Sequence, residues 1–296
     1  MQIQLIKYFY TVRFSETPIL YPIYSTYQHQ SKAFEPEQLA TYRLRVLIRD
    51  GMLLYVVLSS ASKVLAVREY RSHEPLGIGE FFERIYQQDY FLKEDYDSVE
   101  IVNGTLSFSL IPSRYFAPQR MKEFAGALIK DSFDTEHLAY RAIDEDKATA
   151  IFLVPGQVKE KFDAHFQGPD FLPACQPLIK MAHRISEAHP DLVLVTLFQN
   201  QFVITALRKG QLRICNTYDF QAADDMVYFI QLIQDLLELQ ERPTVFLHGD
   251  FDPQSDFFRD LKGFLPELQT TSPILENRFE GDASPLLQSK YAYLTF

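Results

Sequence analysis

A pattern of three strands followed by an amphipathic helix occurs twice along the chain. The first copy covers Leu44–Tyr70 and continues into a helical stretch at Leu76–Leu92. The second copy covers Leu192–Phe220 and continues at Ala222–Leu239. Apolar residues alternate with other residues in the strands and recur at helical spacing in the helices. Two copies of this unit predict two stacked α/β lobes with a cleft between them.

Turn signals divide the first copy and the region after it. Asp50-Gly51 predicts a tight type I′ hairpin, because glycine adopts positive φ at little cost. Asn103-Gly104 predicts a second two-residue turn, joining strands at Ser98–Val102 and Thr105–Ile111. In the second copy, Gln199-Asn200-Gln201 occupies the position that corresponds to Asp50-Gly51.

The remaining elements are predicted by shorter patterns. A helix is expected from about residue 117 to 129, followed by a pair of strands at His137–Ile143 and Ala148–Val154. Thr244–His248 reads as a short buried strand. Asp252-Pro253 then predicts the start of a helix, with aspartate as the N-cap and proline at the first helical position.

The N-terminal stretch has no clear periodicity. Thr17-Pro18 and Tyr21-Pro22 disfavour helix there, because the residue before proline is pushed towards extended conformations. We therefore expect residues 1–33 to form a peripheral extension whose deletion leaves a folded protein. The two lobes are then expected at 34–147 and 148–296.

Composition and charge narrow the class of protein. The chain has 296 residues, of which 47% are hydrophobic and 23% charged, as in ordinary globular proteins. Its formal net charge is −10 at pH 7, and its pI is near 5.2. This charge argues against broad electrostatic binding to nucleic acid or to an anionic membrane.

The cysteines and the apolar runs point to a cytoplasmic location. Cys175 and Cys215 are the two cysteines, and neither has a partner at the spacing of a redox or zinc motif. The N-terminus lacks the apolar core of a signal peptide. The apolar run Met52–Leu58 is far too short to span a bilayer.

From Phe34 onward the chain resembles the DUF3822 family of uncharacterised bacterial proteins, most familiar from Bacteroidetes. The resemblance is carried by Phe34–Gly51 (FEPEQLATYRLRVLIRDG), Ser107–Pro112, Ile151–Pro155 and the meander at 192–220. It implies an actin-like ATPase fold, in which two ribonuclease H-like lobes each hold a mixed sheet flanked by helices. It implies no particular activity or substrate.

The same resemblance directs attention to a nucleotide cleft. In active members of the actin-like superfamily, Asp and Gly at the first turn of each lobe hold metal and cradle phosphate. Asp50 and Gly51 fit this pattern in type, but Met52 and Leu53 replace the small and hydroxyl residues that let phosphate approach. The second-lobe turn has neither Asp nor Gly. Gly249 stands where a glycine pair near adenosine is usual, so the cleft is expected to be degenerate.

A different chemistry is conceivable at His248, Asp250 and Asp252. At alternate positions of an extended segment these side chains point to one side, as metal ligands must. The simpler interpretation is that His248 ends a strand, Asp250 lies in a turn and Asp252 caps a helix. The histidines and serines elsewhere assemble no recognisable catalytic motif.

Three hypotheses follow. The favoured one is a protein with an actin-like fold and a degenerate nucleotide site, which binds an unidentified protein partner and is not an enzyme. The second is a nucleotide-binding protein that holds ATP and Mg²⁺ with Asp50, Gly51 and Gly249. The third is a metal-dependent hydrolase built on His248 and Asp250. No nucleic-acid or membrane partner is expected.

Overall fold

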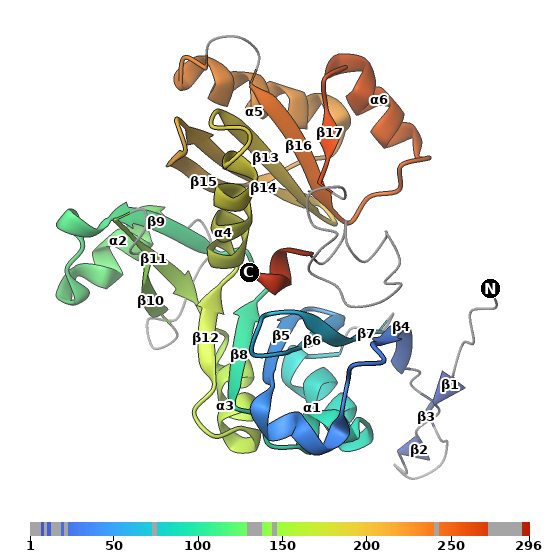
Figure 1. Ribbon diagram of the computed structural model, residues 1–296. Coiled ribbons are helices and arrows are strands. Elements are labelled where there is room, and N and C mark those ends of the chain that lie inside the picture. The colour runs from blue at the N-terminus through green and yellow to red at the C-terminus, as the bar shows by residue number, and fades with distance from the viewer. Residues whose placement is uncertain are drawn as a thin grey trace. The chain divides into compact units, whose positions relative to one another are not determined.

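The computed structural model describes residues 7–8, 11–12, 19–20, 23–72, 76–128, 138–143, 147–239, 243–271 and 292–296 (Figure 1). They form two compact units. The first contains the described residues up to Thr105 together with Val154–Leu172. The second contains Leu106–Leu153 and the described residues from Pro173 onward. The expected boundary at 147/148 does not match this division, because the chain leaves the first unit at Thr105 and returns to it at Val154.

The first unit is built on a seven-stranded sheet in the order β1-β4-β7-β6-β5-β8-β12. Its strands are β1 (Lys7–Tyr8), β4 (Ile23–Gln30), β5 (Arg43–Arg49), β6 (Met52–Leu58), β7 (Val64–Ser72), β8 (Ser98–Asn103) and β12 (Asp170–Pro173). β5, β6 and β7 form an antiparallel meander, and β8 joins β5 in parallel. β6 is buried at every position, which explains its unbroken apolar sequence. β2 (Thr11–Val12) and β3 (Ile19–Leu20) form a separate two-stranded sheet.

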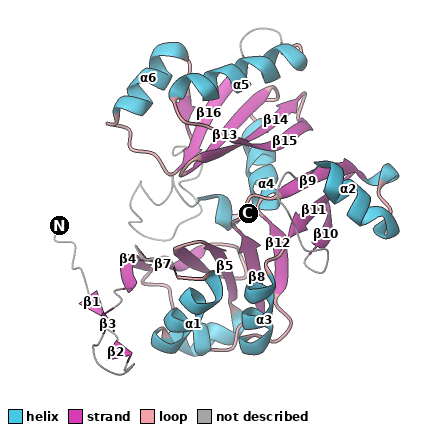
Figure 2. Cartoon of the chain, turned by 180° about the vertical axis from the view of Figure 1, so that it is seen from behind, coloured by secondary structure: helices cyan, strands magenta, loops and turns pink. Residues whose placement is uncertain are grey.

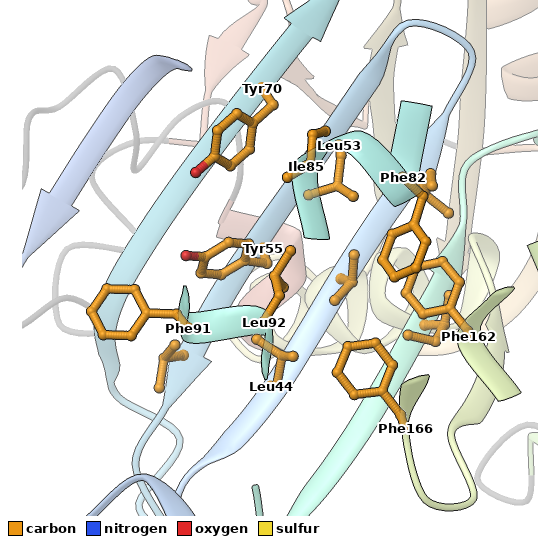
Figure 3. Close-up of a cluster of buried hydrophobic side chains, with 14 of the residues drawn as sticks. Leu44, Leu53, Tyr55, Tyr70, Phe82, Ile85, Phe91, Leu92, Phe162 and Phe166 are labelled. Atoms are coloured by element: carbon orange, nitrogen blue, oxygen red, sulfur yellow. The ribbon is translucent and has the colours of Figure 1, made fainter. Parts of the chain in front are cut away.

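Two helices, α1 (Ile78–Gln88) and α3 (Gly156–His165), pack together against this sheet. Their aromatic residues form the centre of the hydrophobic core (Figure 3). The rings of Phe82 and Phe162 stack with centroids 4.1 Å apart, and Phe166 lies 5.7 Å from Phe162. Short 3-10 helices, η1 (Pro36–Thr41) and η2 (Tyr90–Lys93), complete the layer.

Strand β4 overturns the expectation for the N-terminus. It pairs antiparallel with β7, and its Ile23 is buried in the core of the first unit. The peripheral-extension prediction for residues 1–33 is therefore wrong for this strand. β4 is half-buried and mostly polar, so it carries no strong hydrophobic alternation. Deleting residues 1–33 would expose the edge of β7, and we now expect that deletion to destabilise the unit.

The second unit is built on a five-stranded sheet in the order β15-β14-β13-β16-β17 (Figure 2). Its strands are β13 (Leu192–Phe198), β14 (Gln201–Arg208), β15 (Gln211–Asp219), β16 (Thr244–Gly249) and β17 (Gln269–Thr270). Helices α5 (Ala223–Leu236) and α6 (Asp256–Phe264) pack together over one face. Helix α4 (Cys175–Ser186) covers the other face and contacts the C-terminal turn η9 (Ala292–Thr295).

Both main sheets contain the same core order. Numbered within each unit from the start of the meander, the strands lie 3-2-1-4-5, with strand 4 parallel to strand 1. The turn between strands 1 and 2 is tied to the end of strand 3 in each unit. The Ser72 N–H donates to Gly51 O at 2.9 Å, and the Phe220 N–H donates to Asn200 O at 3.2 Å. The prediction of two meanders in separate sheets is confirmed.

A three-stranded sheet, ordered β10-β11-β9, belongs to the second unit. It contains β9 (Phe108–Pro112), β10 (Leu138–Ile143) and β11 (Ala148–Leu153), with α2 (Met121–Leu128) packed against it and η3 (Ser113–Tyr115) and η4 (Pro118–Arg120) before that helix. The predicted pairing of β10 with β11 is confirmed.

The predicted hairpin at Asn103-Gly104 is wrong. β8 pairs with β5, whereas β9 pairs with β11. The glycine serves a close approach instead: its N–H donates to Ile48 O at 2.9 Å, and a Cβ at Gly104 would lie 2.9 Å from that same oxygen. A local turn signal and a close-packing glycine look alike in sequence.

Candidate functional site

The Asp50-Gly51 turn of the first unit is a tight hairpin connection between the paired residues Arg49 and Met52. Gly51 has φ +65°, whereas Asp50 is not among the residues with positive φ. The turn is therefore not the expected type I′ and has the φ signs of type II. Asp50 is exposed, and the Gly51 carbonyl is bonded to Ser72.

The two residues expected to crowd a phosphate at this turn are packed into the protein. Leu53 is fully buried in the core, and Met52 is 3% exposed. The Arg49 Nε–H donates to Met52 Sδ at 3.3 Å. Asp50 thus remains as the one exposed acidic side chain of this turn.

The matching turn of the second unit has different chemistry. Gln199 and Asn200 are exposed and connect the paired residues Phe198 and Gln201. The Gln201 side chain donates from Nε2 to Asp219 Oδ1 at 2.8 Å, which ties the turn to the end of β15. The turn itself supplies no carboxylate, as its sequence indicates.

Gly249, at the end of β16, is required by packing. It has φ +103°, and a Cβ there would lie 2.3 Å from Leu197 O. The next two amides are engaged within the protein: Asp250 N–H donates to Leu197 O at 3.1 Å, and Phe251 N–H donates to Gly249 O at 3.2 Å. Both amides that follow Gly249 therefore already have acceptors within the protein.

His248 is fully buried on the sheet face that contacts η9. Its Nδ1 lies 2.8 Å from Thr271 Oγ1, and its ring meets that of Tyr293 edge-on at 5.7 Å. Its Nε2 and the Oγ1 of Thr196, its cross-strand neighbour, have no hydrogen-bond partner among the described residues. Burial lowers the pKa of His248 to about 3, because the imidazolium would lose its hydration.

The structure does not bring His248, Asp250 and Asp252 together as a metal site. No group of three or more His, Cys, Asp or Glu in the described part of the chain is positioned to hold a metal ion. The positive φ of Gly249 breaks the extended alternation on which the metal hypothesis depended. Asp252 Oδ1 accepts from the Gln254 N–H at 2.9 Å, and the N-cap of α6 is Ser255, not Asp252.

Asp89 is a buried polar centre in the first unit that the sequence did not single out. Its carboxylate accepts from Tyr55 Oη at 2.6 Å, Tyr70 Oη at 2.7 Å and Arg68 Nη1 at 2.7 Å. A fourth bond comes from the Phe91 N–H at 3.0 Å. Burial and the neighbouring carboxylate raise the pKa of both tyrosines, whose rings lie on adjacent strands (Figure 3). An acid directly before the apolar residues Tyr90, Phe91 and Leu92 was the available signal.

A groove of about 380 Å³ lies in the second unit between β9 and β15. Each strand is the outermost of its own sheet. The groove is lined by Ser109, Leu110, Ile111, Pro112, Lys147, Ala148, Leu212, Arg213, Ile214, Cys215 and Asn216. The sequence gave no signal for it, because its two walls lie about a hundred residues apart along the chain.

The two walls meet at one end of the groove. Thr217 Oγ1 donates to Leu106 O at 3.0 Å, just before β9 begins and near the end of β15. The lining then runs forward along β9 to Pro112 and backward along β15 to Leu212. The two strands therefore run in opposite directions along the groove.

The charged groups among the described residues of the groove are all positive. Lys147 and Arg213 are exposed, and no Asp or Glu is among the described residues that line the groove. Lys147 has φ +52°, and the Ser113 N–H donates to its carbonyl at 2.7 Å, which fixes the backbone at this wall. The groove is thus a locally basic surface in a chain with a formal charge of −10.

Comparison with known proteins identifies the fold. A family model described as "Protein of unknown function (DUF3822)" matches residues 31–268. A crystal structure of a Bacteroides thetaiotaomicron protein with actin-like ATPase fold and unknown function is similar over 89% of this chain and 99% of that chain, with a TM-score of 0.73 and 16% identity.

A second solved structure is the PilM-PilN type IV pilus biogenesis complex. The match covers 85% of this chain and 96% of that chain, with a TM-score of 0.59 and 13% identity. At these identities both likenesses establish the actin-like fold alone. No curated protein matches the sequence. No helix among the described residues is long and apolar enough to cross a membrane.

Proposed function

We propose a protein-binding function for this chain, which belongs to the DUF3822 family and has an actin-like ATPase fold. In this proposal it holds a protein partner and does not hydrolyse ATP. The observation that carries it is the second unit's strand end, where the turn has no carboxylate and both amides around Gly249 are bonded internally.

The chemistry of phosphoryl transfer gives this observation its weight. Catalysis requires a metal anchor, a placed water and donors that neutralise the developing charge. Asp50 is one exposed carboxylate at the first-unit turn, and the corresponding residue of the second unit is Gln199. A lone acid without a counterpart is a poor Mg²⁺ site, because such ions in nucleotide sites depend on substrate phosphates held in place by other groups.

A protein-binding role has precedent in the fold. PilM, which shares it at a TM-score of 0.59, is described in complex with PilN. This chain also offers surfaces suited to a partner, of which the groove between β9 and β15 is the most defined. Binding of a protein partner does not require residues that hold phosphate.

Thermal unfolding with and without ATP and Mg²⁺ tests the nucleotide half of the proposal. Binding at a hundredfold excess over the dissociation constant would add about 2.7 kcal/mol of stability and raise the melting temperature by roughly 5 °C or more. We expect no such shift. A shift, or an ATPase activity that disappears in Asp50→Ala, would replace this proposal with the nucleotide-binding alternative.

Affinity purification of the full chain from its own cells tests the partner half. A protein that co-purifies in a fixed ratio and re-forms the complex from purified components supports the proposal. Recovery of the chain alone over a range of salt concentrations contradicts it.

A further inference from the structure

We propose that the groove between β9 and β15 binds an extended acidic segment of a partner protein, which adds as a strand to the open edge of β15. This inference rests on the proposed protein-binding function and names the surface and the chemistry of its ligand. Strand addition of this kind draws affinity from main-chain hydrogen bonds and specificity from alternate side chains.

The edge of β15 has the backbone that strand addition needs. β15 pairs with β14 on one side, and no strand among the described residues pairs with its other side. Residues 211–219 include no proline, so every position carries an N–H. The opposite wall is a poorer template, because β9 ends in Pro112, which lacks one. Exposed edges attract added strands unless something covers them.

The contact between Thr217 and Leu106 sets where an added strand begins. It closes the groove near the end of β15 and leaves Leu212–Asn216 along the open part. An incoming segment therefore enters from the Pro112 end. β9 forms the opposite wall of the groove.

Charge and apolar lining specify the ligand. Lys147 and Arg213 favour carboxylates, and no acidic residue among the described residues of the lining opposes them. Leu110, Leu212 and Ile214 are partly buried and supply apolar contacts. Because successive side chains of a strand point to opposite sides, a segment with alternating apolar and acidic residues satisfies both features. Electrostatic complementarity of this kind raises the association rate and selects the partner.

A library of random linear twelve-residue peptides, selected on the immobilised full chain, provides the probe. We expect enrichment of sequences that alternate apolar residues with Asp or Glu. Synthetic versions of these peptides should slow amide hydrogen exchange at 212–216. Their affinity should fall by about tenfold in the double variant Lys147→Asn, Arg213→Gln, since each exposed ion pair contributes up to about 1 kcal/mol.

The matched control is Lys209→Asn. Lys209 is exposed, lies in the same unit and has φ +53°, nearly the φ of Lys147, but does not line the groove. Asparagine tolerates this backbone conformation, so neither lysine substitution should disturb folding. We expect the control to bind the peptides as the parent chain does.

Three results would overturn the inference. The first is failure of the library to yield acidic extended peptides. The second is binding that neither slows exchange at 212–216 nor weakens in the double variant. The third is concentration-dependent dimerisation that the double variant abolishes in the absence of peptide, which would make a second copy the occupant.

A different variant separates failure of this inference from failure of the proposed function. Helix α5 exposes an apolar stripe at Tyr228, Leu232 and Leu236, with 61%, 46% and 68% of each residue exposed. If the co-purified partner is lost in Leu232→Asp and retained in the groove variant, protein binding stands and the groove proposal fails. If no partner co-purifies at all, the proposed function fails first.

Discussion

In the first unit, the buried carboxylate of Asp89 accepts four hydrogen bonds. In the second unit, the buried imidazole of His248 has one ring nitrogen within bonding distance of Thr271, and the other has no partner among the described residues. The Oγ1 of the neighbouring Thr196 also has no hydrogen-bond partner among the described residues. The two sites therefore differ, although the sheets that carry them share a strand order: the Asp89 carboxylate has four donors, whereas the buried polar atoms at His248 and Thr196 are incompletely paired among the described residues.

This difference indicates which polar groups determine the structure. Asp89 joins β6, β7 and η2, because its donors come from all three elements. Removing it leaves several buried donors without this acceptor, and a buried donor without a partner lowers stability more than the loss of a fully removed pair. The Thr196 Oγ1 and the His248 Nε2 have no such partners among the described residues, so removing either atom should cost little stability.

The largest expected effect on stability comes from replacing Asp89. Asp89→Ala should lower the free energy of unfolding by about 3–5 kcal/mol, because it removes the carboxylate that Arg68 and two tyrosine hydroxyls share. Thr196→Val is the comparison in the second unit, and it should leave stability unchanged or raise it by up to about 1 kcal/mol. Urea unfolding of both variants measures the contrast. Equal losses would contradict it.

The second effect compares the glycines at the ends of the two fourth strands. Gly249→Ala should cost about 3 kcal/mol or more, since it combines φ +103° with a Cβ placed 2.3 Å from Leu197 O. Gly104→Ala should cost less, about 1–2 kcal/mol, because its closest contact is 2.9 Å and its φ is not positive. Thermal unfolding decides the order, and a reversal would mean that backbone conformation matters less than we infer.

The third effect is a pH dependence confined to the second unit. The pKa of His248 is about 3 in the folded state and about 6.5 when exposed, so the unfolded chain binds its proton first as pH falls. The stability of the folded state with neutral His248 is fully present above pH 6.5, and it is lost progressively as the pH falls towards 3. Between pH 7 and 5 the parent chain should lose about 2 kcal/mol more than His248→Gln. Parallel pH profiles of the two proteins would refute this prediction.

The smallest effect compares the two hairpin turns. Gly51→Ala should cost about 1 kcal/mol, because Gly51 has φ +65° and a Cβ there would lie 3.2 Å from Ser72 O. Asn200 holds the corresponding position without positive φ, so Asn200→Ala should change stability by less than about 0.5 kcal/mol. Chemical denaturation resolves a difference of this size when the slopes agree.

The duplicated meander was predictable because each strand and helix carries its own hydrophobic period. The actin-like fold was predictable from the resemblance of Phe34–Gly51 and the later motifs. The N-terminal strand β4 was not, since a half-buried and mostly polar strand has weak hydrophobic alternation. Asn103-Gly104 misled because a glycine chosen for close approach and a glycine in a turn give the same local signal.

The site residues illustrate a second limit. The sequence located Asp50, Gly249 and His248 at a turn or at the end of a strand. It did not predict which residues they contact. Gly249 is explained by Leu197, and His248 by Thr271, which are distant in sequence. The groove between β9 and β15 depends in the same way on two segments brought together by the fold.

The interrupted path of the first unit has a consequence for synthesis on the ribosome. β12, an outer strand of the first sheet, ends at Pro173, and Leu106–Leu153 is translated before it. At roughly 5–20 residues per second, the nascent chain spends several seconds with the first sheet incomplete and the β9–β11 segment already emerging. That segment must wait for β15, which is made later still. The order of translation thus places one wall of the groove, β9, on the nascent chain well before the opposite wall, β15, has been made.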